Sequence, residues 1–114
     1  MENFEIINIG KTKLYNFAQS TDVNISNAFT SLFFELYANP IMDTQMFLYE
    51  HPYISIKDKI IVDCGANMGL FSAWAATHCK QVYAFEPALG ILPYLNKTAS
   101  LYDNITIIPK GVAE

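Results

Sequence analysis

The chain has 114 residues and a formal net charge of −4, and its composition is 52% hydrophobic and 16% charged. This length fits one domain of ordinary size, and the apolar fraction excludes a globally disordered chain, which would show the opposite balance. All seven basic residues are lysines, so the side chain best suited to bidentate phosphate contacts is missing. Together with the mild acidity, this composition predicts that nucleic acid is not a partner.

Several other classes are disfavoured by local features. The first 13 residues do not combine a basic start with an apolar run, and no apolar run approaches the roughly 18 to 20 residues of a membrane-spanning helix. Cys64 and Cys79 are interpreted as two buried free thiols, and neither His51 nor His78 has a spacing typical of metal ligands. We therefore predict a cytoplasmic protein with no membrane span and no metal centre.

The first half of the chain predicts a mainly helical flank, residues 1–55. Residues 4–9 favour a short strand that a turn at residues 10–13 closes. A helix is expected from a cap at Ser26 or Asn27, with its end at Asn39 because proline follows. Residues 44–49 favour a second short helix, and we expect the aromatic side chains of this flank to pack on a neighbouring domain.

The second half, residues 56–114, alternates between strand and helix patterns. Strands are predicted at residues 60–64, 81–85 and 105–108, and helices at 70–78 and 91–101. Pro93 is compatible with the second helix only in its first turn. This βαβαβ order predicts the α/β class, with parallel strands in the Rossmann-like arrangement that binds mononucleotides.

Chemically suggestive residues follow the first two of these strands. Gly65 and Gly69 lie in the loop after the first strand; Gly65 lets the backbone approach a ligand, and Gly69 lets the next helix start close to the strand. Asn67 is predicted to cap that helix. Glu86 follows the second strand, where a carboxylate can accept hydrogen bonds from ribose hydroxyls. Asp63, at the base of the loop, is placed to hold a ligand ammonium group.

The loop departs from the common nucleotide-binding patterns. Where a dinucleotide loop would have its second and third glycines, this chain has Asn67 and Leu70, and no lysine follows the glycines as in a phosphate-binding P-loop. The spacing of Asp63, Gly65 and Gly69, with an acid at the next strand end, favours S-adenosylmethionine, which has no phosphate to cradle.

Three segments together resemble the FkbM family of S-adenosylmethionine-dependent methyltransferases: residues 63–72 (DCGANMGLFS), 82–87 (VYAFEP) and 104–113 (NITIIPKGVA). The resemblance covers residues 56–114. It implies a class I methyltransferase fold and O-methylation of a small-molecule or carbohydrate hydroxyl. Carried over by position, it also implies that Glu86 holds the ribose and that Gly111 or Val112 lies near the adenine. The residues it assigns to the methionine side of the cofactor are Asp63, Gly65, Asn67 and Gly69, and Ala66 in the same loop is also predicted to bind the cofactor.

The chain ends after the third predicted strand, so the fold is expected to be an incomplete class I domain. We expect the strand order 3-2-1, which leaves the first strand as an open edge through which the chain can self-associate. The groups that would remove a proton from the acceptor are expected in later strands and loops, and no catalytic residue is assigned. The alternatives are a non-catalytic nucleotide-binding or assembly module and an inactive gene remnant.

Overall fold

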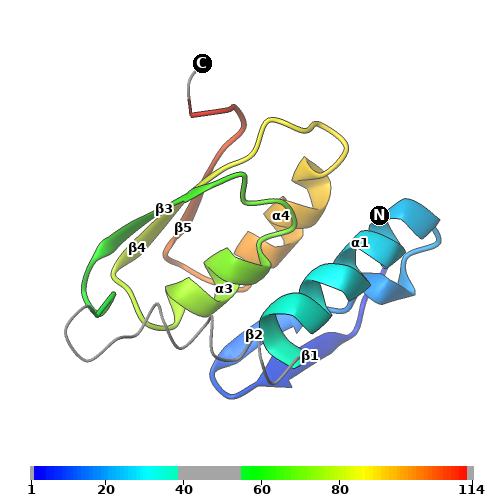
Figure 1. Cartoon of the computed structure of the whole chain (residues 1–114), viewed down its shortest axis with the longest axis horizontal. Helices are drawn as coiled ribbons and strands as arrows, with labels where there is room; N and C mark the ends of the chain where they lie inside the picture. The colour runs from blue at the N-terminus through cyan, green and yellow to red at the C-terminus, as the bar shows by residue number, and fades with distance from the viewer. Residues whose placement is uncertain (1, 39–54, 113–114) are drawn as a thin grey trace.

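The computed structural model describes residues 2–38 and 55–112 and shows an α/β fold in three layers (Figure 1). The first layer is a parallel sheet of β3 (Ile60–Cys64), β4 (Gln81–Phe85) and β5 (Ile105–Ile108). Helices α3 (Leu70–Ala76) and α4 (Leu92–Ala99) form the second layer, and the amino-terminal elements form the third. The βαβαβ order predicted from the sequence, and thus a partial Rossmann-like fold, is confirmed.

The sheet has the order β3-β4-β5, and all three strands have the bounds predicted from the sequence. Parallel pairing sets Asp63 opposite Ala84 and Cys64 opposite Phe85, so the residues that follow β3 and β4 emerge at one edge of the sheet. The buried side chains Val82 and Ala84 of β4 lie at the centre of the sheet. The common edge where the strands end is the place where open parallel sheets bind ligands.

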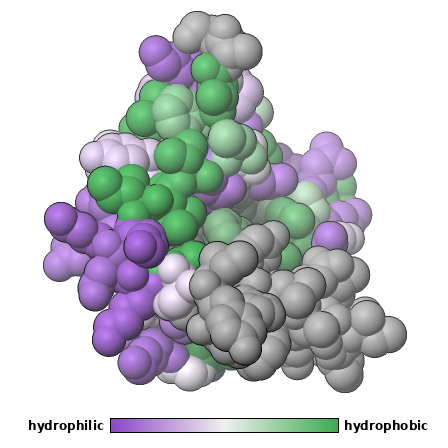
Figure 2. Space-filling model, turned by 60° about the vertical axis from the view of Figure 1, so that its left-hand side comes forward, coloured by the Kyte–Doolittle hydropathy of each residue, from purple (hydrophilic) through white to green (hydrophobic). Residues whose placement is uncertain are grey.

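Strand β3 is an edge of this sheet within the described part of the chain. Ile60 and Val62 are 60% and 54% exposed, and Figure 2 shows hydrophobic side chains gathered on the side of the molecule where β3 lies. Cys64, the last residue of β3, is exposed, and Cys79 is partly buried. Both thiols are free, but the prediction that both are buried is wrong. Cys64 ends a strand at the edge of the described sheet, and Cys79 lies in the connection between α3 and β4.

The amino-terminal part begins with a β-hairpin, of which only the first strand was predicted from the sequence. Strand β1 (Ile6–Ile9) pairs antiparallel with β2 (Thr12–Tyr15), so residues 12 and 13 belong to a strand and not to the predicted turn. The loop is only Gly10 and Lys11, and Gly10 has the positive φ (57°) that such a short hairpin loop needs at its first position.

Helix α1 (Val23–Phe33) begins earlier than predicted, with its cap four or five residues before the expected one. Its cap is Asp22, whose carboxylate accepts hydrogen bonds from the amides of Asn24 and Ile25, and not Ser26 or Asn27. A short 3₁₀ turn, η1 (Phe17–Gln19), precedes α1, and a π-helical turn, η2 (Phe34–Ala38), continues it. The predicted helix at 44–49 lies outside the residues that the structure describes.

Phe17 is the centre of the core that joins the amino-terminal elements to the two helices on the sheet. It is fully buried and makes edge-to-face contacts with Phe4, Phe29 and Tyr94 at centroid distances of 5.0, 5.8 and 5.1 Å. Such aromatic pairs stabilise by about 0.5–1.5 kcal/mol each beyond their buried area. Because Tyr94 belongs to α4, these contacts attach the third layer to the second.

A polar contact reinforces this attachment. The hydroxyl of Tyr102 accepts a hydrogen bond from the Lys13 amide and donates one to the Lys13 carbonyl, both at 2.7 Å. One side chain that follows α4 therefore satisfies both backbone groups of a residue in β2. Across residues 2–38 and 55–112, no helix is both long and apolar enough to cross a bilayer.

Candidate functional site

The loop between β3 and α3 is attached by its backbone to the end of β4. The amides of Gly65 and Ala66 both donate to the carbonyl of Phe85, at 3.0 and 2.9 Å. Gly65 and Asn67 have positive φ values of 72° and 55°, a conformation that glycine adopts freely and asparagine more readily than most residues. The loop therefore folds back onto the strand end where Glu86 follows, which brings the two predicted halves of the site together.

Glu86 is buried, with 8% of its surface exposed, and its carboxylate is held by backbone amides on two sides. Its Oε1 accepts a hydrogen bond from the amide of Asn67 at 2.7 Å, and its Oε2 accepts one from the amide of Ala88 at 3.0 Å. Hydrogen bonds to a charged acceptor are stronger than those between neutral groups. The residue predicted to hold a ribose thus also holds the shape of the loop.

Asp63 lies at the base of the loop and is bound to α3. Its Oδ2 accepts a hydrogen bond from the hydroxyl of the fully buried Ser72 at 2.6 Å. Burial raises the pKa of the Asp63 carboxyl, the Ser72 hydrogen bond acts in the opposite direction, and the nearby Glu86 raises the pKa further. A cation placed next to Asp63 would relieve this penalty, which is consistent with the predicted ammonium-binding role.

Asn67 does not cap α3, contrary to the prediction. The cap position is Gly69, with φ of 84°, and no side chain makes a capping hydrogen bond there. The side-chain oxygen of Asn67 is instead buried and has no hydrogen-bond partner among the residues described. A buried polar atom without a partner costs about 1–3 kcal/mol, so a ligand that donated a hydrogen bond to this atom would recover that cost.

Gly69 is needed for a different contact than the sequence suggested. A Cβ at this position would lie 2.9 Å from Cδ1 of Leu95 and 3.1 Å from Cγ2 of Thr98, both in α4. The glycine therefore permits the close approach of α4 to the start of α3. Thr98, almost fully buried, donates from its hydroxyl to the carbonyl of Met68 at 2.7 Å and so anchors the loop from behind.

Ser72 and Thr98 are site residues that the sequence reasoning missed. Ser72 carried a usable signal, because a small polar residue in the first turn of the helix after a glycine loop can face the acid at the strand end. Thr98 carried none, since its partner is a backbone carbonyl 30 residues away. Both act by holding loop groups in place, which the order of residues alone does not reveal.

The remaining predicted residues lie around the same edge of the sheet. A Cβ on Gly65 would meet no atom within 4 Å, so this glycine faces open space where a ligand can approach the backbone. Ala66 is buried against Leu95 and Ala84. Gly111 and Val112 follow β5, and Val112 is 56% exposed. Open space at Gly65, an unpartnered oxygen at Asn67 and a carboxylate at Glu86 are compatible with a polar, phosphate-free cofactor.

Comparison with known proteins finds relatives among RNA methyltransferases. A ribosomal RNA small subunit methyltransferase A of Macrococcus caseolyticus is 38% identical over 56 residues, which are 49% of this chain and 19% of that protein. The protein of the same name from Staphylococcus aureus is 38% identical over 52 residues, 46% of this chain and 18% of that protein. The chain thus spans less than a fifth of these relatives. No family model matches it.

Solved structures show the same fold. An rRNA methylase from Streptococcus thermophilus has a TM-score of 0.52 and 29% identity, over 64% of this chain and 43% of that one. PRMT6 has a TM-score of 0.52 at 20% identity, over 71% of this chain and 25% of that one, and so shows the fold alone. An FkbM methyltransferase from Methylobacillus flagellatus has a TM-score of only 0.43 at 24% identity, over 83% of this chain and 30% of that one, and supports no conclusion about FkbM in particular. The likeness is to methyltransferases in general.

These findings correct one prediction. The exclusion of nucleic acid as a partner, in favour of a small-molecule or carbohydrate acceptor, is contradicted by relatives whose names specify ribosomal RNA. The error has a physical origin: lysine count and net charge were read from a chain that aligns with less than a fifth of those relatives. Groups that contact an acceptor are not required to lie in the segment that binds a cofactor.

Proposed function

We propose that this chain forms the cofactor-binding part of an S-adenosylmethionine-dependent methyltransferase. The observation that carries the proposal is the hydrogen bond from the Asn67 amide to the Glu86 carboxylate, which sets a glycine loop and a strand-end acid into one site. The 38% identity to methyltransferases over about half of the chain supports it independently.

The described residues suggest how the cofactor would be held. Glu86 would accept from the ribose hydroxyls, Asp63 would face the ammonium group, and Asn67 would offer its unpartnered oxygen. Gly65 would let the backbone lie against the ligand. When bound, S-adenosylmethionine supplies an electrophilic methyl group for transfer. The task of these residues is to orient it, because positioning provides much of the rate of such a transfer.

RNA is the acceptor class that we propose. It rests on the names of the relatives, which are ribosomal RNA methyltransferases in two bacterial genera and an rRNA methylase of known structure. The chain has no arginine, so phosphate contacts within it would come from lysines, which act on phosphate as point charges.

Calorimetry with S-adenosylmethionine tests the cofactor assignment. We expect saturable one-to-one binding, with NAD binding far more weakly; tight NAD binding or no S-adenosylmethionine binding would overturn the assignment. The informative variant is Asn67→Gly, which tolerates the positive φ and removes the buried oxygen. It should weaken binding by about tenfold, the equivalent of one hydrogen bond of roughly 1.4 kcal/mol, without lowering the melting temperature. Asn96→Ala, on the exposed side of α4, is the matched control.

The acceptor needs a separate experiment. Transfer of a radiolabelled methyl group would be measured with the chain and with the longest open reading frame that contains it, using small-subunit ribosomal RNA as the acceptor. Label in the RNA supports the proposal. Binding of S-adenosylmethionine with label only in small hydroxyl compounds would retain the cofactor and overturn the acceptor class.

A further inference from the structure

A cavity of about 360 Å³ lies between the amino-terminal hairpin and α3, and none of its lining residues belongs to the predicted cofactor site. Its volume falls in the range typical of small-molecule sites, about 300 to 1,000 Å³. The walls come from three separate parts of the fold: the hairpin tip, the η2 turn and the carboxyl-terminal half of α3 with the residues after it. The described residues that line it are Ile9, Gly10, Lys11, Thr12, Leu36, Tyr37, Trp74, Thr77 and His78.

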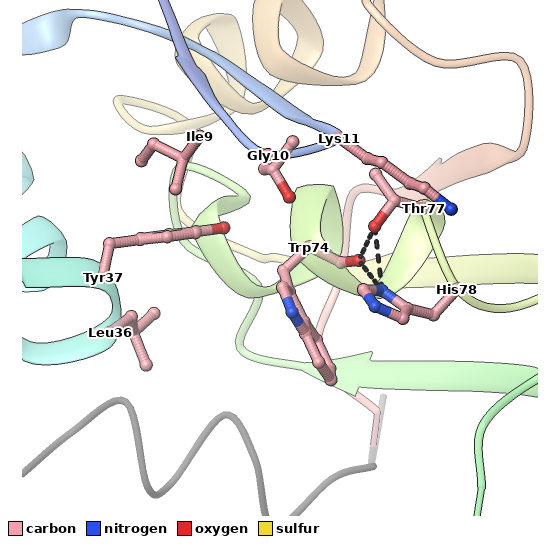
Figure 3. Close-up of a pocket in the computed structure, with 9 residues that line it drawn as sticks. Ile9, Gly10, Lys11, Leu36, Tyr37, Trp74, Thr77 and His78 are labelled. Atoms are coloured by element: carbon pink, nitrogen blue, oxygen red, sulfur yellow. Dashed lines mark hydrogen bonds between the residues drawn. The ribbon is translucent and has the colours of Figure 1, made fainter.

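The two sides of this cavity differ in chemistry, as Figure 3 shows. Ile9, Leu36 and Tyr37 lie on one side, and Lys11, Thr77 and His78 on the other, with Trp74 between them. The Tyr37 hydroxyl donates to the carbonyl of Leu70 at 2.5 Å, and burial raises the pKa of Tyr37 well above its ordinary value. Tyr37 therefore stays neutral and presents its ring as part of the apolar side.

Hydrogen bonds to the backbone fix the polar side. The hydroxyl of Thr77 and Nδ1 of His78 both approach the carbonyl of Trp74, at 2.7 and 3.0 Å. The Thr77 hydroxyl also lies 2.8 Å from Nδ1 of His78. Nδ1 is thus engaged within the protein, and Nε2 is the remaining polar atom of the ring. The imidazole also lies against the indole, with ring centroids 4.6 Å apart. The two rings thus form one rigid wall.

Among the described residues that line the cavity, Lys11 carries the charge. None of the nine described lining residues carries a carboxylate. A flat apolar body would be favoured beside Trp74 and Leu36, while an anionic group would be favoured next to Lys11. A neutral apolar ligand would contact the apolar side but would make no ion pair with Lys11.

We propose that this cavity binds a small aromatic carboxylate, with its ring between Trp74 and the Leu36–Tyr37 side and its carboxylate at Lys11. The proposal does not depend on the methyltransferase assignment, because it uses none of the residues of that site. It assigns a ligand-binding role to the hairpin, whose loop supplies the cation.

The chain has a single tryptophan, so the fluorescence of Trp74 reports on this cavity directly. The probes are 3,5-dinitrobenzoate, an aromatic anion that quenches indole fluorescence, and 3,5-dinitrobenzamide, its neutral counterpart of nearly equal shape. We expect saturable quenching by the carboxylate and at least threefold weaker binding of the amide, as loss of a partly exposed ion pair of about 0.7 kcal/mol would give.

Two hairpin variants separate specific binding from general attraction. Lys11→Met retains most of the side-chain length and removes the charge; it should weaken binding of the carboxylate by at least threefold, on the same estimate, and leave the amide unaffected. Lys13→Met is the matched control, because Lys13 is an exposed lysine two residues away that does not line the cavity. Equal affinity for the two probes, equal effects of the two variants or quenching that does not saturate would each overturn the proposal.

Discussion

The carboxylate of Glu86 accepts a hydrogen bond from the amide of Asn67 at 2.7 Å, and this contact joins segments 19 residues apart in the chain. The same carboxylate receives the amide of Ala88 on its other oxygen. A substitution that removes the charge of Glu86 is therefore expected to weaken the hydrogen bonds of the loop even when no ligand is bound. Because two backbone amides bind this carboxylate, Glu86 is expected to contribute to stability in addition to the proposed cofactor binding.

Glu86→Gln should lower both the stability and the affinity for S-adenosylmethionine. The glutamine amide has one oxygen, so one of the two backbone donors faces an NH₂ group and loses its acceptor. We expect a loss of about 1–3 kcal/mol in the free energy of unfolding, measured by urea denaturation, and weaker binding in calorimetry. Glu5→Gln, at an exposed position, is the control and should change neither. Unchanged unfolding of Glu86→Gln would contradict the assigned role in the loop.

Asp63→Asn should stabilise the chain at neutral pH. Because burial raises the pKa of Asp63 above the ordinary value of 3.8, the folded state keeps its proton where the unfolded chain has already lost it. Stability from this group therefore falls as pH rises through the window between the two pKa values. Asparagine has no such cost and still offers an oxygen to Ser72.

Unfolding measured between pH 4 and pH 7 checks this prediction. The stability difference between Asp63→Asn and the unchanged chain should grow as pH rises and then level off. Asp103→Asn, at an exposed site, provides the comparison. The same substitution should weaken S-adenosylmethionine binding, since it removes the charge proposed to face the ammonium group. A difference independent of pH would show that Asp63 does not titrate as described.

Gly69→Ala should destabilise the fold by about 1–3 kcal/mol, the cost typical of overpacking. The added Cβ meets Leu95 at 2.9 Å, and the φ of 84° is unfavourable for alanine. Gly90→Ala is a sharp control, because its Cβ would meet no atom within 4 Å. Thermal denaturation of the two variants should separate them clearly; equal melting temperatures would mean that α4 does not pack against Gly69.

Tyr102→Phe should loosen the hairpin from the helices. The hydroxyl makes two hydrogen bonds to the backbone of Lys13, and their loss should cost about 1–2 kcal/mol. Hydrogen exchange read residue by residue is the suitable measurement: the Lys13 amide should exchange faster, while the amides of β4 change little. Tyr83→Phe, within β4, serves as the control for loss of a tyrosine hydroxyl. Unchanged exchange at Lys13 would refute the contact.

Elements with strong local signals were well predicted from the sequence. The bounds of β3, β4 and β5 followed from short apolar runs that glycine or proline interrupts. Helix α4 tolerates Pro93 because the proline lies in its first turn, as expected. The amino-terminal part was predicted less well, because β2 contains lysine and threonine as well as apolar residues and so has no clear strand pattern. Its pairing depends on β1 and on Tyr102, 89 residues away from Lys13.

The sequence by itself determined the α/β order, the strand bounds and the meeting of the glycine loop with Glu86 at one sheet edge, because these depend on local periodicity and on the rules of parallel sheets. Only the tertiary structure decided what each side chain contacts. In the folded chain, the Glu86 carboxylate accepts a hydrogen bond from the Asn67 amide, and the Asn67 side-chain oxygen has no partner among the described residues. Gly69 packs closely against α4, and a cavity lies between elements that are distant in the chain. These relationships depend on close packing between segments far apart in sequence, and local patterns carry no information about such packing.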